Sequence, residues 1–156
     1  MAALLALAIA VGAAGCGEEE GVEDGATVTA YMEKPLCQRP ESATVPTDGG
    51  SIALEFVCLP AARGPELGQG VGGGRQVDLA TAGANARRAT EDSTTVAYVG
   101  ESGTAARFSR PILEAAGIAF VPSSSEDRAI QQILDAVSRA DPGSLRADVR
   151  EILDLQ

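Results

Sequence analysis

The chain has 156 residues, a formal net charge of -10, no histidine and 3% aromatic residues. About 140 residues follow its apolar amino-terminal stretch, which is enough for one domain with its own core and too few for two. An acidic chain without a basic stripe repels nucleic acid, and its few aromatic side chains offer little for base stacking. The composition therefore excludes nucleic acid as an expected partner.

Residues 1–16 predict an export signal, because they carry no charge and are apolar or small throughout. The stretch is too short to span a bilayer as a mature helix. Its last four residues, AAGC, match the bacterial lipobox, in which the cysteine, here Cys16, receives the lipid. The alternative is a buried apolar helix that ends in an ordinary cysteine. The acidic, glycine-rich residues 17–25 favour a solvated tether, so we expect an extracytoplasmic lipoprotein anchored to the bacterial cell membrane.

The other two cysteines, Cys37 and Cys58, form an even pair once Cys16 is lipidated. Each lies at or just past the end of a predicted strand, over residues 26–34 and 51–59. A disulfide between them is reasonable if those strands are parallel neighbours, and two unpaired core thiols are the alternative. Because the chain lacks histidine and the thiols show no ligand-type spacing, we expect no metal site and no cofactor.

Apolar and turn residues predict alternating strands and helices over the rest of the chain. A first strand over 26–32 precedes a loop over 38–50, which is rich in proline, glycine and hydroxyl residues. The second strand, 51–59, leads into a glycine-rich segment over 60–75. That segment contains a G-x-G-x-x-G run, but several residues separate the run from the strand, so we expect a plain loop and no nucleotide site.

The later elements are a helix over 76–92, a strand over 94–100, a helix over 104–116, a strand over 118–121 and two amphipathic helices separated by a turn at 141–144. The helix over 104–116 is expected to bury Phe108, Ile112 and Leu113. Pro111 predicts that this helix begins late or is kinked. An apolar stripe from Leu145 to Leu153 marks the last helix, and its exposure would favour a protein partner.

Two strand-to-helix turns carry small hydroxyl residues, namely Ser102 with Thr104, and Ser123–Ser125. Open parallel sheets bind ligands at the carboxyl ends of their strands, where backbone N–H groups and helix N-termini point at anions. Hydroxyl and N–H groups can hold the α-carboxylate of an amino acid, and Glu101 is a candidate acceptor for its ammonium. The alternative is that these residues only cap helices.

The turn over residues 100–104 has the setting of a hydrolase nucleophile elbow but lacks its pattern. G-x-S-x-G requires glycine where Thr104 stands, and the chain has no histidine to deprotonate Ser102. We therefore expect no catalytic residue and no enzyme.

Residues 83–125, GANARRATEDSTTVAYVGESGTAARFSRPILEAAGIAFVPSSS, resemble the first lobe of the periplasmic solute-binding proteins of branched-chain amino acid (leucine, isoleucine and valine) ABC transporters. That family shows an A-x-x-A-R-x-L…V-x-A-V-I-G run, a serine-rich turn and then P-I-L-E-E-A-G-I-P…I-S-P-S-A-T. The resemblance implies a ligand site in the two hydroxyl turns, made by Ser102, Gly103, Thr104, Ser124 and Ser125.

The expected fold is an α/β three-layer sandwich, a single lobe of the type I periplasmic-binding kind. Its sheet is expected to have four mainly parallel strands in the order 2-1-3-4, over residues 26–140, followed by a C-terminal amphipathic helix over 141–156. The family follows its first strand with a long helix, which the loop over 38–50 replaces here.

The resemblance implies an extracytoplasmic solute-binding lipoprotein for amino acids in a shortened, one-lobe form. Its expected partners are the solute, an ABC transporter permease and the membrane through the lipid anchor. A second lobe from another chain is an alternative partner. The alternative functions are a non-catalytic surface interaction lipoprotein and a truncated receptor lobe with no working ligand site.

Overall fold

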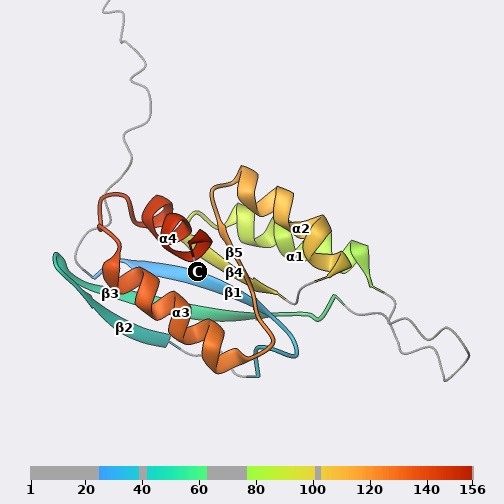
Figure 1. Ribbon diagram of the computed structural model, residues 1–156, viewed down its shortest axis with the longest axis horizontal. Helices are drawn as coiled ribbons and strands as arrows, with labels where there is room; N and C mark the ends of the chain where they lie inside the picture. The colour runs from blue at the N-terminus through green and yellow to red at the C-terminus, as the bar shows by residue number, and fades with distance from the viewer. Residues whose placement is uncertain (1–24, 39–41, 63–76, 101–102, 156) are drawn as a thin grey trace, which may run out of the picture.

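The computed structural model describes residues 25–38, 42–62, 77–100 and 103–155 (Figure 1). Their elements, in chain order, are β1 (Thr27–Glu33), β2 (Ser42–Thr47), β3 (Gly50–Leu59), α1 (Leu79–Glu91), β4 (Thr95–Gly100), α2 (Thr104–Ala115), β5 (Ala119–Pro122), α3 (Glu126–Arg139) and α4 (Leu145–Asp154). None of the described helices is both long enough and apolar enough to cross a membrane.

The strands form one sheet in the order β2-β3-β1-β4-β5. Strand β1 pairs in parallel with both β3 and β4, and β4 pairs in parallel with β5. Strand β2 is antiparallel to β3. The expected four-stranded sheet was therefore wrong in its strand number, because the sheet has five strands and is mixed. Without β2, the four parallel strands lie in the order β3-β1-β4-β5.

The fifth strand lies in the segment 38–50 that was predicted to be a loop. It forms a hairpin with β3 through Asp48 and Gly49, and Val45 is buried against the sheet. Pro46 cannot donate a ladder hydrogen bond, but an edge strand tolerates that loss. Pro46 hid this strand, because a proline is acceptable in a sheet mainly on an edge strand.

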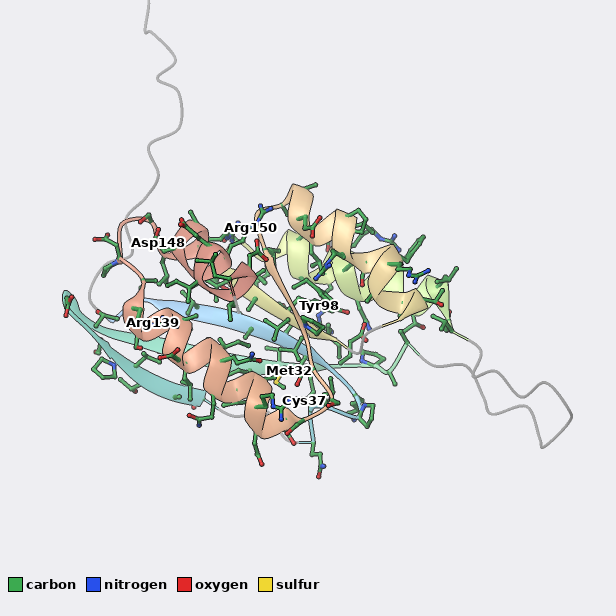
Figure 2. The ribbon with its side chains drawn as sticks, in the orientation of Figure 1. Met32, Cys37, Tyr98, Arg139, Asp148 and Arg150 are labelled. Carbon is green, nitrogen blue, oxygen red and sulfur yellow. A yellow bond between two sulfur atoms is a disulfide. The ribbon has the colours of Figure 1, made fainter. Side chains whose placement is uncertain are left out.

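Helices cover both faces of the sheet, which confirms the predicted α/β class. Alternate residues of each strand point to opposite faces, so Met32 of β1 belongs to the core beneath α3 and α4, whereas Tyr31 belongs to the core beneath α1 and α2. Figure 1 shows α3 and α4 together on one side, and α1 and α2 paired on the other. Side chains fill the space between each helix pair and the strands (Figure 2).

The set of α2 residues that face the core differs from the prediction. Leu113 is fully buried and Ile112 packs on the same core, but Phe108 is 44% exposed. Ser109 occupies a buried position instead, and its hydroxyl donates to the carbonyl of Ala105 at 3.0 Å. Phe108 lies over Gly83 of α1, where a Cβ atom would come within 3.0 Å of its ring. Gly83 of α1 thus lets α2 approach closely, and α2 continues through Pro111.

The last helix is packed rather than exposed. Leu145 and Val149 are buried in the core beneath α3 and α4, and Ile152 and Leu153 pack against it. The exposed apolar stripe that would favour a protein partner is therefore not found on α4.

The predicted disulfide between Cys37 and Cys58 is present, with their Cα atoms 5.4 Å apart. Cys58 lies opposite Met32 in the pairing of β1 with β3, so the bridge ties the segment after β1 to the carboxyl end of its neighbour. Cys37 is buried, and it lies near the start of α3 (Figure 2).

Reduction of this disulfide is expected to lower the free energy of unfolding by about 3 kcal/mol, because the unfolded chain regains the freedom of the closed loop. The melting temperature should fall by on the order of 10 °C for a domain of this size. Calorimetry with and without reductant measures the change, and Cys37→Ala with Cys58→Ala should reproduce it. An unchanged melt of the double variant would contradict a stabilising role.

Candidate site at the carboxyl edge of the sheet

The carboxyl ends of the parallel strands meet at one edge, and the chain changes direction there. From β1 the chain leads to β3 on one side, and from β4 it leads to β5 on the other. The boundary between β1 and β4 is therefore a topological switch point, where open α/β sheets usually hold their ligands. Glu33 ends β1 and Gly100 ends β4, directly at this boundary.

The predicted site residues lie at this edge in two turns. Gly103 and Thr104 begin α2 after β4, and Ser124 and Ser125 precede α3 after β5. Because β4 and β5 are hydrogen-bonded neighbours, these two turns follow adjacent strand ends. Ser102 and Glu101 lie outside the described residues.

The turn before α2 has the features of an anion-binding position. Gly103 is the N-cap, with a φ of +129° that favours glycine, and it has no side chain to cap the helix. By contrast, Asp78 caps α1 by accepting hydrogen bonds from the N–H groups of Ala80 and Thr81. The first turn of α2 carries no acidic residue. No side chain among the described residues accepts from the first backbone N–H groups of α2, and such groups can meet a negatively charged ligand group.

The start of α3 is acidic, unlike the first turn of α2. Its first helical turn contains Glu126 and Asp127, which satisfy the helix dipole from within the chain. The carboxylate of Glu126 also accepts a 3.0 Å hydrogen bond from the backbone N–H of Gln38, which joins the segment after β1 to α3. Ser125 is the N-cap without a side-chain capping bond, and Ser124 is exposed.

Ser123 has a structural role in that turn. Its hydroxyl donates to the carbonyl of Ser125 at 2.8 Å and accepts from the N–H of Ser125 at 3.2 Å. Its own N–H donates to the carbonyl of Gly100 at 3.0 Å. The hydroxyl is therefore committed to the turn, which leaves Ser124 as its exposed serine.

Glu33 is the residue at this edge that the sequence analysis missed. It is only 5% exposed, and its carboxylate accepts hydrogen bonds from the Tyr98 hydroxyl and, at 3.5 Å, from the Asn85 amide. The Asn85 amide also donates to the carbonyl of Pro60 at 2.8 Å. A buried carboxylate needs such donors because desolvation otherwise makes its charge costly. The sequence did hold a signal for this. Glu33 lies two residues after Tyr31 in β1, so both side chains face the core beneath α1.

The hydrogen bonds of Glu33 hold the ends of β1 and β4 together at the switch point. Glu33 comes from β1, Tyr98 from β4 and Asn85 from α1, so three elements share one carboxylate. A Cβ atom on Gly100 would lie 3.5 Å from Glu33 Oε2, which shows how close the carboxylate is to the end of β4. Tyr98 is fully buried, among the strands in Figure 2.

A groove of about 280 Å³ adjoins the α2 turn. It runs between α2 and the outer side of β5, and the described residues that line it include no acid. The lining residues are Gly103, Ala106, Arg107, Arg110, Phe120 and Pro122. The guanidinium of Arg110 lies 5.2 Å from the centre of the Phe120 ring. The carboxyl edge thus continues into a positively charged groove.

Two larger hollows lie at the opposite edge of the sheet. One, of about 500 Å³, is lined by α4 and Gly117, and the other, of about 350 Å³, by the starts of β1, β4 and α4. They share no residue with the predicted site. Within the described ranges, no group of three or more acidic or cysteine side chains is arranged to hold a metal ion.

Comparisons with protein-family models, with curated proteins and with solved structures gave no match to this chain.

The raised pKa values of two tyrosines predict how the free energy of unfolding changes at alkaline pH. Burial and the Glu33 carboxylate raise the pKa of Tyr98 above its ordinary value, and burial and the hydrogen bond to Asp92 raise the pKa of Tyr31. A raised folded-state pKa contributes stability that is fully present below about pH 10 and is lost above it, as the unfolded chain ionises first. The free energy of unfolding should fall above about pH 10, by up to roughly 1.4 kcal/mol per pH unit for each tyrosine.

Urea unfolding across this pH range measures the slope, and absorbance at 295 nm reports tyrosinate. Tyr98→Phe should flatten the slope and cost about 1–3 kcal/mol at neutral pH, since the Glu33 carboxylate loses a buried donor. Tyr31→Phe is the matched control, with a smaller cost at neutral pH because its hydroxyl is only part-buried. Ionisation of Tyr98 near pH 10 in the folded protein would contradict the prediction.

Proposed function

We propose that this chain is an extracytoplasmic lipoprotein that binds an amino acid at the carboxyl edge of its sheet. The observation that carries the proposal is the difference between two helix starts that follow adjacent strands: the first turn of α2 carries no acid, and the first turn of α3 carries two. The uncapped start of α2 suits a carboxylate, and the acidic start of α3 suits an ammonium group. An amino acid carries both groups on one carbon atom. The resemblance of residues 83–125 to amino acid receptors supports the same ligand class.

In the proposed complex, the α-carboxylate lies at the first turn of α2, where the N–H groups and the Thr104 hydroxyl donate to it. The ammonium faces the hydroxyl of Ser124 and the carboxylates at the start of α3. Thr104 and Ser124 are both exposed, so the ligand reaches them without a rearrangement of the core. Glu33 is a positioning residue, because its buried carboxylate holds β1, β4 and α1 beneath the site.

A single lobe supplies half of the contacts of a two-lobed receptor, so a weak affinity is expected. Millimolar dissociation corresponds to about -4 kcal/mol, which a few charge-assisted hydrogen bonds provide. Tighter binding would require a second lobe from another chain, and delivery would require a transporter permease. We propose no catalytic role, because the chain has no histidine and Thr104 interrupts the nucleophile pattern.

The amino acid site is tested by titrating the oxidised chain with the common amino acids at up to millimolar concentration. Saturable NMR shifts are expected at the amides of residues 103–105 and 123–125. Thr104→Val should weaken binding by roughly three- to tenfold, which is the loss of one hydrogen bond of about 1 kcal/mol. The matched control is Thr44→Val, an exposed threonine on β2.

If no amino acid shifts these amides, the proposed site is wrong. The chain would then be a non-catalytic interaction lipoprotein, or a receptor lobe without a working site, whose turns serve only to begin helices.

Lipid attachment is tested by Cys16→Ser in a bacterial host. The wild-type chain should fractionate with membranes and incorporate labelled fatty acid, and the variant should lose both because it lacks the thiol that receives the lipid. Cys58→Ser leaves Cys16 in place and should keep the label. Membrane fractionation of Cys16→Ser would rule out the lipobox interpretation.

A further inference from the structure

We infer that the groove between α2 and β5 binds a second acidic group of the solute, so that the site prefers a dicarboxylic amino acid to an aliphatic one. This inference rests on the proposed function for the placement of the α-carboxylate and the ammonium. It adds that the two arginines of the groove select a solute whose side chain is acidic.

The groove is built by one face of α2 against the end of β5. Its α2 residues are spaced at helical intervals and therefore lie along one line of the helix surface. They are Gly103, Ala106, Arg107 and Arg110. Phe120 and Pro122 of β5 form the opposite wall. Because Gly103 also belongs to the α2 turn, the groove begins where the α-carboxylate is placed.

Two contacts orient the half-exposed side chain of Arg110. Its guanidinium stacks on Phe120 at 5.2 Å, and Phe120 stacks in turn on the fully buried Tyr98, with ring centres 6.1 Å apart. Its Nε pairs with a carboxylate oxygen of Glu114 at 3.5 Å. Among the described residues no side chain engages its two terminal nitrogens. A guanidinium oriented in this way presents those donors to a planar carboxylate.

Arg107 supplies a second cation one turn closer to Gly103. Its side chain forms no ion pair or hydrogen bond with any residue in the described part of the chain. Other arginines do pair, as Arg139 does with Asp135 at 2.5 Å and Arg150 with Asp154 at 3.6 Å. In a protein of net charge -10, the groove is therefore a basic patch, lined by two arginines and, among the described residues, by no acid.

The two guanidinium groups select against an aliphatic side chain. Placing leucine in the groove would remove water from charged groups without supplying a hydrogen-bond acceptor, which is unfavourable. A side-chain carboxylate supplies two acceptor atoms in the geometry that arginine prefers. The volume of about 280 Å³ suits a small solute. The carbon stem of such a solute would contact Ala106 and Pro122.

The experiment is calorimetry on the full-length oxidised chain with L-glutamate, L-glutamine, L-leucine and glutarate at one fixed ionic strength. Glutamine has the shape of glutamate without the charge, and glutarate has two carboxylates without the ammonium. Glutamate is expected to bind at least tenfold more tightly than glutamine or leucine. Arg107→Gln and Arg110→Gln should each reduce this preference to threefold or less, and Arg107→Lys should keep part of it.

Arg139→Gln is the matched control, because Arg139 lies in the last turn of α3, at the far end of that helix from the proposed site, and its loss should leave the preference unchanged. Equal binding of glutamate and glutamine, or a preference that survives both groove variants, would overturn the inference while the amino acid site stands. Glutarate binding that depends on Arg107, without binding of any amino acid, would support the groove and reject the amino acid site. Binding of none of the four would reject both.

Discussion

The buried carboxylate of Glu33 is the constraint on which the carboxyl edge depends. It ends the central strand β1, and it is held by Tyr98 from β4 and Asn85 from α1. Loss of either donor would leave a buried charge partly uncompensated, which is costly inside a protein. The network therefore fixes where α1 crosses the sheet and where β4 ends. The turn before α2 starts where β4 ends, so the position of this turn also depends on the network.

The rim of this edge is closed by contacts between segments that are far apart in the sequence. The Cys37–Cys58 disulfide ties the segment after β1 to β3, and the Glu126 carboxylate ties the same segment to α3. These links join both sides of the switch point above the Glu33 network. Such links restrain the described part of the edge, and a restrained site loses less freedom when a ligand arrives.

The electrostatic pattern of the edge contrasts with the charge of the whole protein. Acidic residues predominate overall, and α3 begins with Glu126 and Asp127. Beside them, α2 begins without an acid and presents Arg107 and Arg110. An acidic helix start beside a groove lined by arginines orients a zwitterion, and such a groove on an acidic protein guides an anion toward it. Both effects agree with the proposed solute.

The sequence by itself determined the parallel strands, the helices and the cysteine pair, because apolar periodicity, turn residues and the number of cysteines are local signals. It did not determine β2, since Pro46 is acceptable only at a sheet edge, nor the exposure of Phe108, which the close packing of α2 on α1 decides. The burial of Glu33 and the groove at Arg110 also required the tertiary structure. Each depends on residues from separate elements meeting in space, and no local pattern records such a meeting.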